Sequence, residues 1–331
     1  MRAARCNEYG PPETLAVEEV PAPTLRAGQA LVGVRGASVN YPDVLVVANE
    51  YQVSIPLPFT PGSEFAGVVL DVGDGVSTVR VGDRVCGAGF TGAFADEVAA
   101  AEAALSPVPD SVTFTEAAAF GVVYTTAYHA LRSVAEVQPG EWTVVLGAAG
   151  GVGLAAVEVA HHLGSRVLAA ASTDEKLALC RARGAEATVN YTREDLKERI
   201  KDLTGGAHVV IDPVGGAYSE PALRATRWGG RFVVVGFASG EIPRVPLNLV
   251  LLKGVIVKGF EMRTFAQHAP DAARRDADEL AELFAAGAIR PHVSAVFPLE
   301  RVGEALRAVA DRRALGKVVV DPTAGDATPA A

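Results

Sequence analysis

The chain has 331 residues, of which 49% are hydrophobic and 21% charged, and its formal net charge is -9. This length exceeds what one hydrophobic core usually organises, so two domains are expected. The acidic balance and the lack of a dense Lys/Arg block argue against nucleic acid and anionic membranes as partners. No uninterrupted apolar run reaches roughly 18 residues, which argues against a membrane span.

Cysteine usage is sparse. Cys6, Cys86 and Cys180 are far apart in the sequence, so they indicate neither a disulfide framework nor a Cys-x-x-Cys metal clip. The N-terminal segment MRAARCNEYGPPETL has no apolar signal core. We therefore expect a cytoplasmic protein.

Residues 1 to about 120 are rich in Val, Gly and Pro. Short alternating runs, such as residues 30–34 and 64–70, are separated by turn sequences that include VGDG and VGDR. This spacing predicts an antiparallel β domain.

From Trp142 onward, short β-branched runs alternate with longer helical periods. The predicted strands are residues 143–147, 166–171, 188–191, 208–212, 231–236 and 255–259. Predicted helices include residues 152–163 and 174–183, the second with Thr173 as N-cap and Gly184 as stop. The alternation predicts a parallel, doubly wound sheet. Two further helices, at 272–286 and 299–313, and a strand at 317–320 are expected to pack against the first block.

A glycine-rich loop connects the first of these strands to the first helix. The segment from Trp142 to Gly153 reads WTVVLGAAGGVG, and in the register G-x-G-x-x-G its first position is Ala148 rather than glycine. A tight turn is the alternative interpretation of such a loop. The strand before it and the helix after it favour dinucleotide binding, with the pyrophosphate held at the helix start. The predicted contacts are Ala149, Gly150, Gly151, Val152 and Gly153.

The end of the second predicted strand indicates which cofactor binds. An acidic residue there would hold the ribose hydroxyls of NAD, whereas this chain has Ser172, Thr173 and, one turn later, Lys176. Hydroxyls and an ammonium group can hold the 2'-phosphate of NADP(H), which we predict as the cofactor. The alternative is that Lys176 is solvated and Thr173 only caps the helix, with Asp174 and Glu175 as nearby negative charges.

Several motifs together resemble the medium-chain dehydrogenase/reductase superfamily, and within it the zinc-free quinone oxidoreductase branch that includes zeta-crystallin. The motifs are ASVNYPD (37–43), PGSEFAGVV (61–69), VGDRV (81–85), GAAGGVG (147–153) and VIDPVGG (210–216). The resemblance implies an α/β protein with a GroES-like β-rich catalytic domain at 1–121 and 263–331. A Rossmann domain at 122–262 would bind NADP, and the active site would lie in the cleft between the domains.

The resemblance also implies roles for individual residues. Asn40 and Tyr51 resemble the polar residues at the nicotinamide and substrate end of the cleft, and both are candidate catalytic residues. Lys176 and Tyr191 match positions that flank the adenosine 2'-phosphate and the adenine. The remaining candidate cofactor-binding residues are Asn40, Thr126, Gly236, Phe237, Phe260, Met262 and Arg313.

Zinc ligands are missing where related alcohol dehydrogenases carry them. Val39 stands near a ligand cysteine position and Ser63 at a ligand histidine position, while Cys86 is alone where a structural zinc lobe needs four cysteines. Glu64 remains, but one carboxylate is not a site when zinc takes three protein ligands and a water. We therefore predict a zinc-independent enzyme.

Without a Lewis acid, the substrate must accept hydride readily, and conjugated acceptors fit because they spread the arriving charge onto an oxygen. Asn40, Tyr51 or water would stabilise that oxygen. Tyr51 is the candidate proton donor, with simple packing as its alternative. The leading hypothesis is an NADPH-dependent quinone reductase. The alternatives are a reductase of enones or acrylyl-type substrates, and an NADPH-binding structural or RNA-binding protein, against which the acidic charge counts.

The predicted edge strand at residues 255–259 is apolar, and an unpaired apolar edge strand promotes aggregation. Pairing with a second copy of the chain would cover it, so we predict a homodimer through this strand. Among the histidines, His161, His162, His268 and His292 are expected on the surface, whereas His129 is a candidate for the cleft.

Overall fold

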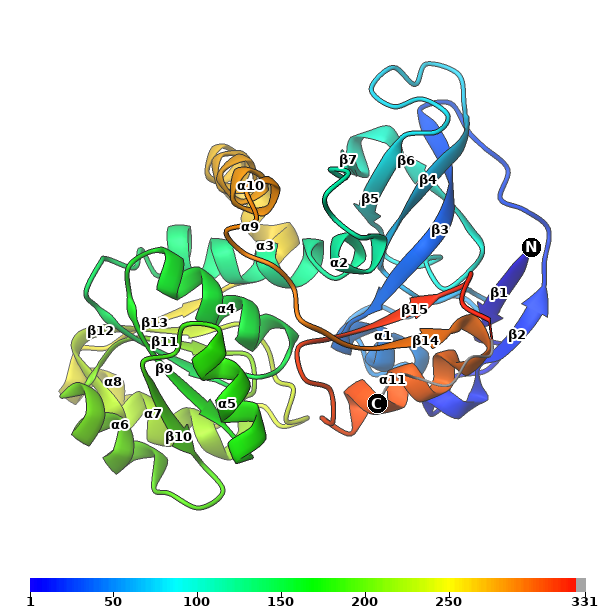
Figure 1. Cartoon of the computed structure of the whole chain (residues 1–331). Coiled ribbons are helices and arrows are strands. Elements are labelled where there is room, and N and C mark those ends of the chain that lie inside the picture. The colour runs from blue at the N-terminus through cyan, green and yellow to red at the C-terminus, as the bar shows by residue number, and fades with distance from the viewer. Residues whose placement is uncertain (326–331) are drawn as a thin grey trace. The chain divides into compact units, whose positions relative to one another are not determined.

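The computed structural model describes residues 1–325 (Figure 1). The chain forms two compact units: unit 1 contains Met1–Val122 and the segment from Arg290 onward, and unit 2 is Val123–Ile289. The chain enters unit 2 next to the expected boundary at 121/122. Its return was expected at 262/263, and this prediction is wrong because residues 263–289 belong to unit 2.

Helices α9 (Met262–His268) and α10 (Pro270–Ala285) form most of the reassigned segment. Polar contacts hold α10 to α3 (Gly121–His129) and to the π-helical turn Ala130–Val134 that follows it. The buried Asp276 carboxylate lies 2.9 Å from His129 Nδ1 and accepts a 2.6 Å hydrogen bond from the Ser133 hydroxyl. Buried polar groups need such partners, so α10 belongs with unit 2.

Unit 1 is built on a sheet with the strand order β14-β15-β3-β4-β5-β7, and β6 also pairs with β3. Its pairs are antiparallel except β14 with β15, so the predicted antiparallel domain is largely confirmed. The strands are β3 (Gln29–Val39), β4 (Glu64–Val72), β5 (Arg84–Ala88), β6 (Glu97–Ala101), β7 (Leu105–Pro107), β14 (Val293–Pro298) and β15 (Lys317–Asp321). A separate hairpin joins β1 (Arg2–Arg5) to β2 (Ala16–Glu19).

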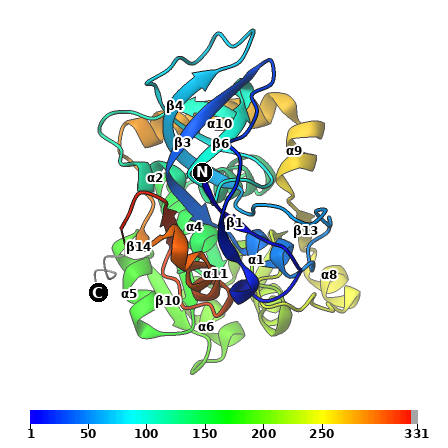
Figure 2. The same ribbon diagram turned by 90° about the vertical axis from the view of Figure 1, so that its right-hand side faces the viewer.

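Helices close the core of unit 1. They are α1 (Tyr41–Val47), α2 (Phe114–Ala118), α11 (Val302–Ala310) and the short 3-10 turns Pro12–Thr14, Glu102–Ala104 and Leu299–Arg301. α1 and α11 lie side by side (Figures 1 and 2). Apolar residues of alternate strand positions, such as Val32 and Val34 of β3, meet Leu299 and Leu306 in one buried cluster. This packing fixes β15 and α1 against β3.

Unit 2 has a parallel sheet in the order β10-β9-β8-β11-β12-β13. Numbered along the chain, this order is 3-2-1-4-5-6, that of a doubly wound dinucleotide-binding fold, so the predicted fold class is confirmed. The strands are β8 (Trp142–Leu146), β9 (Arg166–Ala171), β10 (Ala187–Asn190), β11 (Ala207–Asp212), β12 (Thr226–Val234) and β13 (Ile256–Gly259). The helices between them are α4 (Gly151–His162), α5 (Asp174–Ala182), α6 (Leu196–Thr204), the 3-10 turn Gly216–Tyr218, α7 (Ser219–Ala225) and α8 (Leu247–Lys253).

The loops that follow parallel strands gather at one edge of the sheet, where such folds bind ligands. This edge of unit 2 carries the glycine-rich loop after β8 and the polar segments after β9 and β10. Within residues 1–325, no helix is both long enough and apolar enough to cross a bilayer.

We predict that Asp276→Ala lowers the free energy of unfolding by about 3 kcal/mol, because it leaves the buried partners of this carboxylate unsatisfied. Urea unfolding followed by circular dichroism measures the change. Asp278→Ala is the matched control, since it removes the same charge from an exposed position of α10. Equal stability of the two variants would contradict the anchoring role of Asp276.

Candidate active site

The glycine-rich loop of unit 2 has the geometry that a close phosphate needs. Gly147 has a φ of 58°, in the left-handed region that glycine adopts without penalty. A Cβ on Gly153 would lie 2.2 Å from the Gly147 carbonyl oxygen, so only glycine lets α4 pack this closely on the loop. Gly150 is the N-cap of α4 and makes no side-chain cap, so the first N–H groups of the helix have no side-chain acceptor at that position. This arrangement suits an anion at the helix start.

The predicted adenosine-phosphate residues come together at the ends of β9 and β10. Lys176 Nζ donates to Ser172 Oγ at 3.2 Å, and the Thr173 hydroxyl accepts from the Lys176 backbone N–H as the N-cap of α5. Tyr191 follows β10, and its ring centroid lies 4.2 Å from that of Tyr218. Two hydroxyls, an ammonium group and an aromatic pair therefore share one edge of the sheet.

Asp174 does not stand as an uncompensated negative charge beside this group. Asn190 Nδ2 donates to its carboxylate at 2.9 Å, and Arg193 pairs with it at 2.8 Å. These two contacts, that of Asn190 first, lower the pKa of the Asp174 carboxyl. Sequence reasoning missed Asn190 and Arg193, because neither is near Asp174 in the chain.

Other predicted cofactor residues also lie in unit 2. Gly236 and Phe237 form the turn after β12, where Phe237 is exposed, and Met262 begins α9 after β13. The Phe260 ring is buried against His129 and Phe265, with centroid distances of 6.0 and 5.6 Å, so its side chain serves packing. Thr126 is buried on α3.

Unit 1 holds Asn40, Tyr51 and Arg313. Tyr51 is half-buried, and its ring lies 6.0 Å from that of Phe90. Arg313 is exposed after α11 and pairs with Asp311 at 3.2 Å. Of the histidines expected on the surface, His161, His162 and His268 are exposed and His292 is half-buried. His129, the candidate for the cleft, is buried beside Asp276.

Asn40 lies in a buried polar cluster at the end of β3. Lys317 Nζ donates to Asn40 Oδ1 at 2.6 Å, and Asn40 Nδ2 donates to Glu64 Oε2 at 3.1 Å. An ammonium can only donate and a carboxylate can only accept, so these partners fix the positions of Oδ1 and Nδ2 of the Asn40 amide. The other Nδ2 hydrogen has a long 3.5 Å contact with Ser63 Oγ. Both Nδ2 hydrogens thus have acceptors in the cluster, and the long contact with Ser63 is the weaker of the two.

Glu64 and Lys317 are 2% and 4% exposed, and Glu64 Oε2 lies 3.7 Å from Lys317 Nζ. Lys317 Nζ also donates to the Val39 carbonyl oxygen at 3.1 Å, and Glu64 Oε1 accepts from the Val122 N–H at 2.7 Å. Burial raises the pKa of the Glu64 carboxyl and lowers that of the Lys317 ammonium, while their mutual attraction opposes both shifts. The pair is thus a compensated charge pair inside unit 1.

Asp43 completes the cluster. Its carboxylate accepts from the Asn40 backbone N–H at 2.8 Å and forms a capping box at the start of α1. Burial raises the pKa of this carboxyl to about 6, against hydrogen bonds from Asn40 and Ser63. The Asn-x-x-Asp spacing could have indicated this cap. Lys317 carried no such local signal, since 277 residues separate it from Asn40.

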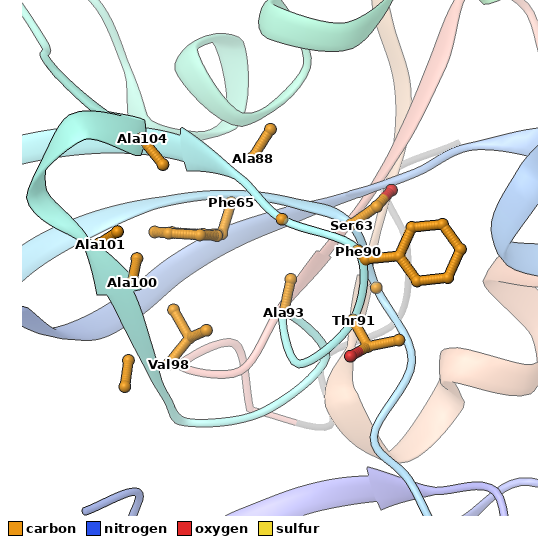
Figure 3. A pocket seen from close by; sticks show the side chains of 13 residues that line it. Ser63, Phe65, Ala88, Phe90, Thr91, Ala93, Val98, Ala100, Ala101 and Ala104 are labelled. Carbon is orange, nitrogen blue, oxygen red and sulfur yellow. The ribbon is translucent and has the colours of Figure 1, made fainter. Parts of the chain in front are cut away.

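A pocket of about 320 Å³ opens beside Ser63 (Figure 3). Alanine is the commonest residue in its wall, which also contains Phe65 and Val98, and the pocket ends at the loop that carries Phe90 and Thr91. In the view of Figure 3, Ser63 and Phe90 lie together at one end of the pocket and Ala101 and Ala104 at the other.

The residues of this cluster do not fit a zinc ion. Val39 and Ser63 occupy the expected ligand positions, and Glu64 already faces the Lys317 ammonium, whose charge would repel a cation. Across the described residues, no group of three or more His, Cys, Asp or Glu side chains gathers as metal ligands would.

Comparison with known families finds two matches. Residues 26–110 match the alcohol dehydrogenase GroES-like domain, and residues 151–282 match the family described as zinc-binding dehydrogenase.

Relatives that match over most of the chain carry the names quinone oxidoreductase or quinone oxidoreductase-like protein 2. The chain is 42% identical to quinone oxidoreductase-like protein 2 of Bos taurus over 323 residues, which cover 96% of this chain and 92% of the relative. It is 39% identical to the quinone oxidoreductase-like protein 2 homolog of Nematostella vectensis over 325 residues, covering 97% and 88%. The structure of Escherichia coli quinone oxidoreductase complexed with NADPH superposes with a TM-score of 0.89 at 28% identity, covering 97% and 100%. The chain therefore belongs to the quinone oxidoreductase family of the medium-chain dehydrogenases/reductases.

Proposed function

We propose that this protein is an NADPH-dependent, zinc-independent quinone oxidoreductase. The observation that carries the proposal is the amide of Asn40, which the buried Lys317 and Glu64 hold as a hydrogen-bond donor. A donor suits an oxygen that gains negative charge as a quinone is reduced, and a fixed donor stabilises such charge without reorganising.

The polar group in unit 2 supports NADPH as the cofactor. Ser172, Thr173 and Lys176 can hold a 2'-phosphate, and Arg193 neutralises the nearby Asp174. The relative from Escherichia coli is described as complexed with NADPH. When bound, NADPH supplies hydride from C4 of its nicotinamide ring.

The side chains of this protein then position and stabilise the acceptor. In the proposal, Asn40 donates its second amide hydrogen to the acceptor oxygen, and Tyr51 lies with Phe90 as an aromatic neighbour of the site. Lys317 and Glu64 neutralise each other, so no net positive charge polarises an isolated carbonyl. This favours acceptors that are already conjugated.

An acceptor screen tests the proposed function. We expect NADPH oxidation to be faster with quinones than with enones or acrylyl thioesters, and Asn40→Ala to lower kcat about 100-fold. Asn7→Ala, an exposed asparagine of unit 1, is the matched control and should keep full activity. Faster turnover of an enone or thioester than of any quinone would replace the proposal with alkene reduction.

Lys176→Ala should raise KM for NADPH about 10- to 100-fold and change KM for NADH little, because a charged hydrogen bond to a phosphate contributes about 1.5–3 kcal/mol. Steady-state kinetics with both cofactors measures the ratio. Lys197→Ala, which removes a surface lysine paired with Glu198, should leave both values unchanged. Equal KM changes for the two cofactors would exclude phosphate recognition by Lys176.

We also propose a homodimer through β13. This strand is the last in the sheet order, and an apolar surface extends from it over β12 and α8, which lie side by side (Figures 1 and 2). Trp228 is 80% exposed and Leu251 is 81% exposed, values that indicate a covered interface. The exposed apolar residues here are Trp228, Ile242, Leu247, Leu251, Leu252, Ile256 and Val257. A two-fold axis would pair the two edge strands and bury these side chains.

Light scattering at micromolar concentration should give twice the mass of one chain for the wild type. Leu251→Glu should shift the protein toward monomer, because a carboxylate would then be buried in an apolar interface. Leu70→Glu is the control, since Leu70 is exposed on β4 of unit 1. A monomeric wild type would disprove the dimer.

A further inference from the structure

The motif VIDPVGG (210–216) contains a buried acid that has so far no role in the proposed function. Asp212 is the last residue of β11 and is 1% exposed. A carboxylate buried to this degree is costly unless hydrogen bonds satisfy it. Its hydrogen bonds join it to the loop and the helix that follow β11.

The Asp212 carboxylate fixes the loop after β11, residues 213–216. Its Oδ1 accepts from the backbone N–H of Val214 at 2.9 Å and from that of Gly215 at 2.8 Å. Its Oδ2 accepts from the hydroxyl of Ser219, the buried first residue of α7. Because a carboxylate accepts stronger hydrogen bonds than a neutral group, this one side chain holds the loop to α7.

The loop after β12, residues 235–241, is bonded to the loop after β11. The N–H of Ser239 donates to the carbonyl oxygen of Val214 at 2.8 Å. In the opposite direction, the N–H of Gly216 donates to the carbonyl oxygen of Glu241 at 3.0 Å. Since these bonds join the two loops, a residue that fixes the first loop also fixes the second.

The loop after β11 also contacts the glycine-rich loop after β8. A Cβ on Gly147 would lie 2.6 Å from Val214 Cγ2, so the Val214 side chain lies directly against that loop. β8 and β11 are neighbours in the sheet, but β8 is followed by β9 on one side and β11 by β12 on the other. Such a switch point is where open parallel sheets bind their ligands.

The position of the two loops indicates which part of the cofactor they receive. In this fold, each half of the sheet binds one mononucleotide. The half with β8, β9 and β10 carries Ser172 and Lys176, which are proposed to hold the adenosine 2'-phosphate. The half with β11, β12 and β13 (Figure 1) is then left for the nicotinamide nucleotide. Because Asp212 is buried, it acts through the backbone of these loops rather than by touching the cofactor.

We propose that Asp212 is the positioning residue for the nicotinamide half of the cofactor. It holds the loops after β11 and β12 in the conformation that receives this half before the cofactor binds. The inference rests on the proposed NADPH cofactor. A loop that must first be ordered weakens binding in proportion to the fraction of molecules in the competent conformation. Loss of Asp212 therefore weakens binding of the nicotinamide half and leaves that of the adenosine half unchanged.

Two ligands test this separation. Adenosine 2',5'-bisphosphate carries only the adenosine half, whereas NADPH carries both halves. Asp212→Ala should raise the Kd for NADPH about 10- to 100-fold, which corresponds to a competent fraction of about 1–10%. It should leave the Kd for the bisphosphate unchanged. Isothermal titration calorimetry measures both constants. Lys176→Ala should weaken both ligands by a similar factor, because both carry the 2'-phosphate.

Ser219→Ala is a milder variant that decides the proposal if Asp212→Ala does not fold. It removes one of the three hydrogen bonds to the carboxylate and should raise the Kd for NADPH about 3- to 10-fold, again without affecting the bisphosphate. Asp212→Asn should restore most of the NADPH affinity. Its amide oxygen can still accept from both backbone N–H groups, and its NH2 group can donate to Ser219 Oγ.

Asp321→Ala is the matched control. Asp321 ends β15 in unit 1 and closes a similar turn, since its Oδ1 accepts from the N–H of Thr323 at 2.8 Å and from its hydroxyl at 2.7 Å. This variant should bind both ligands like the wild type.

Equal weakening of both ligands in Asp212→Ala would overturn the proposal, because the residue would then support unit 2 as a whole. Unchanged NADPH affinity would overturn it as well. A wild type that binds neither ligand would overturn the proposed cofactor and this inference with it. A wild type that binds both but reduces no quinone would overturn the quinone reduction alone, since the binding comparison needs no acceptor.

Discussion

The buried ammonium of Lys317 is the constraint on which the site in unit 1 depends. It binds the carbonyl oxygen of Val39 at the end of β3, the amide of Asn40 at the start of α1, and the carboxylate of Glu64 at the start of β4. Removing one partner of a buried ion pair typically costs about 3–5 kcal/mol, because the other charge is left uncompensated. The cluster therefore holds the end of β3 and the starts of α1 and β4 together. The charges of Lys317 and Glu64, rather than steric packing, fix the orientation of the Asn40 amide.

The two units make different use of electrostatics. Unit 2 offers backbone N–H groups at the start of α4 and exposed or half-buried cationic and hydroxyl groups after β9, which suit the phosphates of a dinucleotide. In the cluster around Asn40, unit 1 buries the charges of Glu64 and Lys317 as a pair, with the half-buried Ser63 hydroxyl beside the amide. In the proposed function, cofactor affinity and acceptor chemistry thus rest on separate groups of residues. The Lys317 ammonium beside Glu64 disfavours a metal ion in this cluster.

Much of the fold could be predicted because its signals are local. The alternation of β-branched runs with helical periods after Trp142 predicted the parallel sheet, and β9 was predicted with its observed bounds. The predicted boundary at which the chain returns to unit 1 was misplaced. The reason is that α10 is amphipathic, and an apolar helix face can pack on either unit. The contacts that decide its place include those of Asp276 with His129 and Ser133, and these join residues more than 140 positions apart.

The sequence by itself determined the family and the two folds, because turn glycines, helix caps and strand periods act between neighbours in the chain. It also indicated Asn40 and Lys176 as candidate site residues. The tertiary structure alone decided what surrounds them: Arg193 beside Asp174, Lys317 beside Asn40, and Glu64 beside Lys317. The physical reason is that burial sets the cost of a charge and the protonation state of an acid, and burial is created only when distant segments pack together.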